Sequence, residues 1–116
     1  YNSFPYMGET IVPIEYGSLG IFDPFENPVS AQFHHRILAT LTLVIVILYF
    51  INYIQKNSIN RRIILLSLAI LSQFIIGIFT LLYSVPIALG VVHQLGGVLL
   101  FLSSLWLLHF QKVKKN

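Results

Sequence analysis

Two histidines, His35 and His93, occupy equivalent positions in two apolar segments, each seven residues after a proline, Pro28 and Pro86. Proline suits the first position of a helix, because its fixed φ is helical and its missing N–H would be unpaired there anyway. At about 1.5 Å of rise per residue, both imidazoles are expected roughly 10 Å below their helix starts. An unpartnered polar ring is costly in an apolar layer, so we expect a ligand that occupies both rings.

The composition indicates that this layer is a lipid bilayer. The 116-residue sequence is 56% hydrophobic and only 9% charged, whereas an ordinary soluble domain carries about 25% charged residues. The uncharged run Ile37–Gln55 is long enough for one crossing, which takes about 20 residues. A second run without acidic or basic residues, Ile63–Gln111, is too long for one crossing. Tyr83–Pro86 contains a hydroxyl and a proline, which are expected to end one helix and start another.

These segments predict an all-α membrane protein with three transmembrane helices, spanning about residues 31–55, 63–83 and 86–110. Residues 1–30 are expected to form an outer segment without a long strand, because prolines interrupt every apolar run in it and remove donors from a strand ladder. Residues 31–116 are expected to form the transmembrane bundle.

The charges predict how the spans are oriented. All four acidic residues precede the first span, and the basic clusters lie between spans one and two (Lys56, Arg61, Arg62) and after span three (Lys112, Lys114, Lys115). The positive-inside rule places these clusters on the cytoplasmic or matrix side, so the acidic segment is expected outside. The net charge of +3 is then explained by the orientation of the spans in the membrane. It requires no nucleic-acid partner, and contact of the basic loops with membrane lipid accounts for it. An outside start predicts an upstream crossing in a complete protein, unless a processed N-terminus is exported.

The predicted topology allows the two histidines to meet. Spans one and three run in the same direction, and an antiparallel second span could pack beside both, so His35 and His93 could face each other. Neutral imidazole is a good axial ligand for haem iron, and two on neighbouring helices favour a six-coordinate, b-type site. Small residues near each histidine could clear room for a flat macrocycle; equally, they could let two helix backbones approach. They are Ala31, Ala39, Gly90, Gly96 and Gly97.

Other polar residues are assigned lesser roles, and none is identified as catalytic. His34 points about 100° away from His35 around the helix and cannot serve the same iron, and His109 is expected at the inner interface. Arg36 could meet a haem propionate, or could extend to water or lipid phosphate. Gln32, Gln73 and Gln94 could bond across helices, the usual role of an amide in a membrane bundle. The absence of cysteine excludes a disulfide framework or a thiolate metal site.

Four short stretches occur in the order found in one family: Tyr1–Pro5 (YNSFP), Gln32–Arg36 (QFHHR), Gly77–Pro86 (GIFTLLYSVP) and His93-Gln94. Together they resemble the C-terminal half of haem A synthase. The resemblance implies an eight-helix membrane enzyme, built as two four-helix halves, that oxidises a methyl group of haem O to the formyl group of haem A for cytochrome oxidase. It also implies that this chain forms most of a four-helix, haem-binding half-bundle.

The resemblance implies roles for His35 and His93 as ligands of the iron of haem b. The haem O substrate and the catalytic carboxylate would belong to the N-terminal half, and the electron partner is not identified by the sequence. The resemblance places the protein in a bacterial or mitochondrial inner membrane, and the lack of cysteine in the outer loop is typical of the mitochondrial and alphaproteobacterial branch. Two alternatives are a b-type cytochrome subunit for electron transfer that uses the same histidines, and a purely structural membrane subunit.

Overall fold

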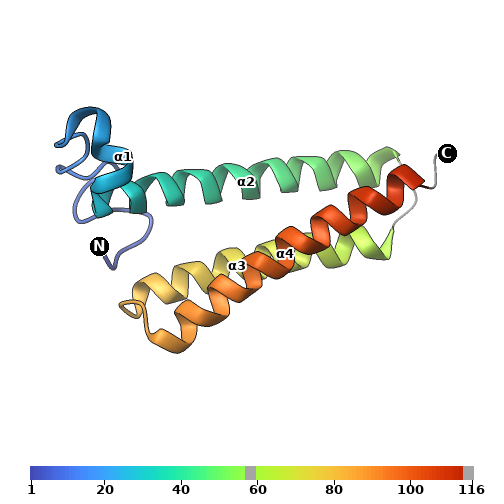
Figure 1. The fold of residues 1–116 in the computed structure, drawn as a ribbon. Helices are drawn as coiled ribbons and strands as arrows, with labels where there is room; N and C mark the ends of the chain where they lie inside the picture. Colours follow the sequence, from blue (N-terminus) through green and yellow to red (C-terminus); the bar gives the residue numbers. More distant parts are fainter. Residues whose placement is uncertain (57–59, 114–116) are drawn as a thin grey trace.

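The computed structural model describes residues 1–56 and 60–113, with side chains up to residue 109. Its elements are a short 3-10 helix η1 (Gly20–Phe22), α1 (Asp23–Glu26), α2 (Pro28–Lys56), α3 (Arg61–Leu82) and α4 (Ile87–Val113), shown in Figure 1. Within the described ranges there is no strand, and β-type pairing is limited to an isolated bridge between Met7 and Thr10. Helices α2, α3 and α4 are each long and apolar enough to cross a membrane. The chain is therefore an all-α, multi-pass membrane protein, as the sequence predicts.

The helix boundaries follow from local caps. Helix α2 begins at Pro28, earlier than the predicted residue 31, because the side chain of Asn27 accepts a hydrogen bond from the Val29 N–H (3.0 Å) and so satisfies one of the free donors at the helix start. Asn60 does the same for α3 by accepting from the Arg62 N–H (2.9 Å). Pro86 lies one residue before α4, and its carbonyl accepts the first helical bond from the Gly90 N–H (2.9 Å).

The break predicted at residues 83–86 is present. Ser84 and Val85 adopt left-handed backbone angles, with φ of 60° and 56°, and the Val85 N–H donates to the carbonyl of Thr80 (2.8 Å). This pattern satisfies carbonyls that the last turn of α3 would otherwise leave free. The chain therefore reverses within a few residues, and α4 returns beside α3.

Helix α3 is the central element of the bundle. It packs against both α2 and α4, whereas no Cα atoms of α2 and α4 lie within 8 Å of each other in the described part of the chain. Figure 1 shows α2 and α4 running in the same direction, with α3 antiparallel to both. The region between α2 and α4 is the place where side chains from both can meet.

A buried carboxylate organises the outer segment. Asp23 is almost fully buried and accepts hydrogen bonds from the backbone N–H groups of Gly17 (2.9 Å) and Leu19 (3.1 Å) and from the amide of Asn27 (2.9 Å). Burial raises the pKa of Asp23, but hydrogen bonds to its charged form outweigh burial and hold the pKa well below its usual range. The loop before α2 is thus tied to the residue that caps α2.

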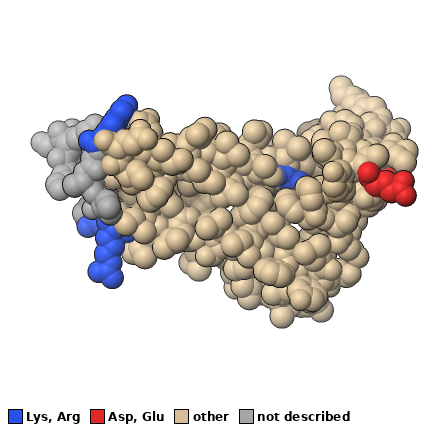
Figure 2. Space-filling model, turned by 180° about the vertical axis from the view of Figure 1, so that it is seen from behind, with Lys and Arg blue, Asp and Glu red and all other residues tan. Residues whose placement is uncertain are grey.

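On the face shown in Figure 2, basic side chains lie at one end of the bundle and acidic side chains at the other, with basic atoms also visible between them. Of the predicted inner cluster, Lys114 and Lys115 lie outside the described residues.

Because the chain has no cysteine, single cysteines can report its topology. In sealed vesicles, a membrane-impermeant thiol reagent on the outer side should label Glu9→Cys, whereas Arg61→Cys should react only after permeabilisation. Labelling of Arg61→Cys from outside would reverse the proposed orientation.

Candidate functional site

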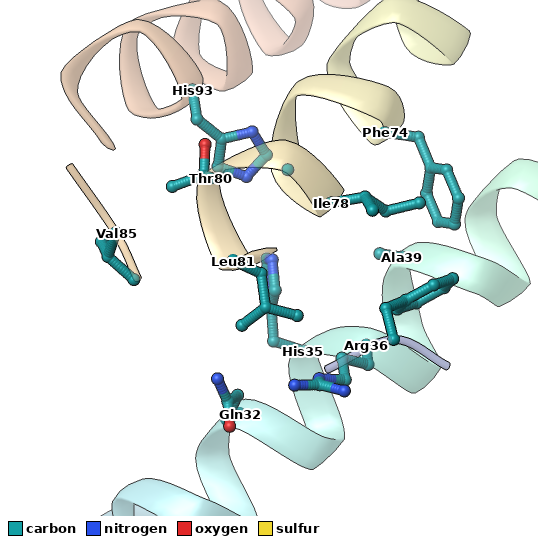
Figure 3. A pocket seen from close by; sticks show the side chains of 12 residues that line it. Gln32, His35, Arg36, Ala39, Phe74, Ile78, Thr80, Leu81, Val85 and His93 are labelled. Carbon is teal, nitrogen blue, oxygen red and sulfur yellow. The ribbon is translucent and has the colours of Figure 1, made fainter. Parts of the chain in front are cut away.

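The two histidines singled out by their spacing lie together. His35 comes from α2 and His93 from α4, their ring centres are 6.2 Å apart and their planes are at 88°. Figure 3 shows the two imidazoles pointing toward one another across the space between the helices, each with a ring nitrogen on the facing side. They meet although the backbones of α2 and α4 do not, so the pair bridges the gap in the bundle.

The separation of the two rings fits a metal ion held between them. A bond from a metal to an imidazole nitrogen is about 2 Å long, so an ion between two imidazoles places the ring centres roughly 6 Å apart. The observed distance of 6.2 Å agrees with this value. Two neutral nitrogen ligands on opposite sides are also a donor set that suits haem iron. Within the described residues there is no cluster of three or more His, Cys, Asp or Glu side chains that could form an all-protein metal site.

Two cavities adjoin the histidine pair, and both are lined by His35, His93, Ala39 and Phe74. The outer cavity has a volume of about 200 Å³, and the inner one of about 540 Å³. The inner cavity is bordered mainly by apolar side chains, among them Leu43, Ile70, Leu100 and Phe101. Space on both sides of the pair, in an apolar setting, is suited to a flat macrocycle larger than a bare ion.

Some of the small residues near the histidines leave room beside the pair, and others allow two helices to pack closely. Ala39 and Gly97 line the cavities, as room for a macrocycle requires. Ala31, Gly90 and Gly96 do not line either of them. Gly96 instead allows close packing, because a Cβ there would overlap the amide oxygen of Gln73.

Gly77 belongs to the candidate site, although the spacing of the histidines does not point to it. A Cβ at this position of α3 would lie 2.8 Å from Cε1 of His93 and 3.4 Å from both ring nitrogens. Gly77 therefore provides the space in which the His93 ring rests against the α3 backbone. The sequence shows that Gly77 lies on the second span. Its place opposite His93 depends on the register between α3 and α4, which the sequence does not give.

The remaining polar residues are held away from the pair or at its edge. The Nε2 atom of His34 is 3.1 Å from the hydroxyl of Tyr16, so this ring is directed to the outer segment and away from His35. His109 lies at the inner end of α4 and is exposed. Gln32 donates to the carbonyl of Tyr1 (3.0 Å), whereas Gln73 bonds across helices to His93.

Arg36 has a partner that the sequence did not reveal. Its Nη1 donates to the carbonyls of Ser3 (2.7 Å) and Tyr6 (3.1 Å), and its Nη2 donates to the carbonyl of Tyr1 (3.1 Å). In the structure the guanidinium therefore donates hydrogen bonds to backbone oxygens of the outer segment, rather than extending to water or lipid. We call residues 1–7 the outer strap.

The outer strap crosses the outer end of the cavity. The amide of Asn2 donates to the hydroxyl of Ser84 in the α3–α4 turn (2.8 Å). The ring of Phe4 lines the outer cavity and packs edge-on against Phe74 of α3, with centroids 6.1 Å apart. Together with Arg36, these contacts connect α2 to α3 and to the turn, and cover the histidine pair from the outer side.

Replacing Arg36 with methionine should loosen the outer strap. A hydrogen bond to a charged group contributes about 1.5–3 kcal/mol, and Arg36 makes three to carbonyls of the strap. The backbone amides of Met7 and Gly8, which donate hydrogen bonds in this segment, should therefore exchange hydrogen at least about tenfold faster, as measured by mass spectrometry. Arg36→Lys is the matched control and should show a smaller effect, because it keeps the charge but loses the forked donor geometry. Unchanged exchange in Arg36→Met would contradict the anchoring role.

Comparison with known proteins identifies the family. Residues 1–105 match the family model COX15-CtaA, described as cytochrome oxidase assembly protein. The chain is 37% identical to the heme A synthase of Wolbachia pipientis wMel, over 93% of the chain and 30% of that protein. It is 39% identical to the heme A synthase of Granulibacter bethesdensis (94% and 29%) and 41% identical to heme A synthase COX15 of Homo sapiens (94% and 28%).

The chain thus spans about 30% of the length of these curated relatives. No solved structure matches it. The family match covers the outer strap, both histidines and all but the inner end of α4. The chain therefore belongs to the haem A synthase family of cytochrome oxidase assembly proteins.

Proposed function

We propose that this chain is the haem b-binding, C-terminal part of a haem A synthase, which oxidises the methyl group of haem O to the formyl group of haem A. The observation that carries the proposal is the approach of His35 and His93 to a ring separation of 6.2 Å, with cavities beside the pair. Membership of the family supports the reaction, and the histidine pair supports a cofactor role for this part of the protein. The membrane would be a bacterial or mitochondrial inner membrane.

In this proposal His35 and His93 hold the iron from α2 and α4. Bound haem supplies one-electron transfer, because its iron changes oxidation state without exchanging ligands. Gly77 gives the His93 ring its place against α3. Phe74 and the apolar side chains of the inner cavity border the pair on one side, and the outer strap lies on the opposite side.

The oxidation itself is assigned to the remainder of the protein. All four acidic residues precede α2, and none lines either cavity beside the histidines. A carboxylate at membrane depth would be a suitable group to assist proton removal during methyl oxidation, and this chain contributes none. Haem O and the catalytic group are therefore proposed to lie in the N-terminal half, with electrons passing to or from a partner not yet identified.

Expression of this chain in membranes, with and without the N-terminal half, tests the proposal. The chain alone should give a b-type reduced-minus-oxidised spectrum with about one haem per chain and should form no haem A from added haem O. Addition of the N-terminal half should allow haem A formation. Absence of a b-type spectrum would overturn the cofactor role. Haem A made by the chain alone would overturn the assignment of the oxidation to the N-terminal half. A b-type spectrum without haem A in the combined protein would favour an electron-transfer cytochrome instead.

A further inference from the structure

Helices α3 and α4 interlock at His93 through two reciprocal contacts. The ring of His93 occupies the space left by the missing Cβ of Gly77 on α3. One turn away, the side chain of Gln73 on α3 lies in a notch formed by Gly96 and Gly97 on α4, where any Cβ on Gly96 would overlap it. Each helix thus inserts one polar side chain into a glycine site of the other, and the two side chains touch.

The contact between these side chains is polar and specific. The amide nitrogen of Gln73 donates to the backbone carbonyl of His93 and lies 3.1 Å from Nδ1 of the His93 ring. A carbonyl oxygen can only accept, so the nitrogen end of the amide faces His93. One side chain therefore bonds both the backbone and the ring of the same histidine.

This arrangement leaves one ring nitrogen of His93 for other partners. Nδ1 is occupied by Gln73, and the ring nitrogen that faces His35 in Figure 3 points away into the site. The partner at one imidazole nitrogen determines the tautomer and the orientation of the ring, and outer partners of metal-ligating histidines commonly act in this way.

We propose that Gln73 is the positioning residue of His93: it holds the ring at Nδ1, so that Nε2 is presented toward His35. This inference rests on the haem-binding function proposed above. Without haem, the amide N–H donates to Nδ1, so the ring proton is on Nε2. With iron on Nε2 the proton would be on Nδ1, and the amide would have to turn its oxygen toward the ring to accept it, giving up its hydrogen bond to the His93 carbonyl. Glutamine can hold the ring in either state, because its amide carries a donor and an acceptor at the same reach and can turn between them.

Two substitutions separate this role from simple packing. Gln73→Leu fills a similar volume without hydrogen bonds. It should weaken haem binding about 10- to 100-fold, as loss of such partners does in other metal sites, and should raise the midpoint potential because the imidazole becomes a poorer electron donor. Gln73→Glu retains an acceptor for Nδ1–H, and should retain haem with a lower midpoint potential. Ser72→Ala is the matched control, since the Ser72 hydroxyl bonds only the preceding turn of α3 (Leu68 carbonyl, 2.9 Å), and it should change neither value.

The tautomer of His93 provides a readout that needs no haem. In the haem-free protein labelled with ¹⁵N-histidine, nuclear magnetic resonance should show His93 with its proton on Nε2, and Gln73→Leu should remove that preference. A protein that bound no haem would overturn the proposed function, while this measurement would still decide the role of Gln73. The inference is overturned if haem-free His93 carries its proton on Nδ1, or if Gln73→Leu leaves haem affinity and midpoint potential unchanged.

Discussion

Replacing either His35 or His93 with alanine is expected to abolish six-coordinate haem binding. The two rings lie 6.2 Å apart, and in the proposed function each substitution would remove one of the two ligands of the iron. Loss of an outer partner of a metal ligand already costs about 10- to 100-fold in affinity, so loss of the ligand itself should cost more. Haem content and the reduced-minus-oxidised spectrum of purified variants measure the effect, and methionine at either position should shift the spectrum.

The two other histidines are the matched controls. His34 contacts Tyr16 in the outer segment, and His109 lies at the inner end of α4, so His34→Ala and His109→Ala should keep the b-type spectrum. A spectrum that survived in His35→Ala and disappeared in His34→Ala would show that the ligand is the first histidine of the Gln32–Arg36 stretch. The register used for the first span would then be wrong by one residue.

Gly77→Ala should have the next largest effect, because its added methyl group meets the ring of His93. The new Cβ would lie 2.8 Å from Cε1 of that ring, closer than carbon atoms approach without displacement. Overpacking of this kind costs about 1–3 kcal/mol, so haem affinity should fall between about fivefold and 150-fold. Haem titration of the purified protein measures the loss.

Gly90→Ala is the control for this substitution. A Cβ at Gly90 would make an ordinary contact of 3.8 Å with Cγ1 of Val85, and alanine favours a helix more than glycine does. Gly90→Ala should therefore bind haem normally. Equal haem affinity in Gly77→Ala and the unaltered protein would show that the His93 ring does not rest against α3.

The spans, their order and the meeting of the histidines could be predicted because they follow from simple patterns. Uncharged runs of membrane length define the three helices, and the equal spacing from Pro28 to His35 and from Pro86 to His93 places both rings at one depth. Together with the parallel direction of spans one and three, these facts predict that the two rings could face each other. The span lengths and the proline-to-histidine spacing are insensitive to small shifts in helix boundaries, such as the start of α4 one residue after Pro86.

The contacts that hold the site could not be predicted in the same way. Arg36 bonds carbonyls of Tyr1, Ser3 and Tyr6, in an irregular segment whose course has no periodicity to read. The pairing of Gln73 with His93 and the role of Gly77 depend on the register between α3 and α4. That register is set by the turn at residues 83–86, where Ser84 and Val85 take left-handed angles that neither residue type would suggest.

Electron paramagnetic resonance of the oxidised, haem-loaded protein can establish whether His35 and His93 are the two axial ligands of one iron. Imidazole planes at 88° would leave the two iron d orbitals that overlap with the rings nearly equal in energy, which would produce a strongly anisotropic low-spin ferric signal. We expect one such signal per chain, replaced by a high-spin signal in His93→Ala. A high-spin signal in the unaltered protein, or a low-spin signal that persists unchanged in both His35→Ala and His93→Ala, would contradict ligation by this pair.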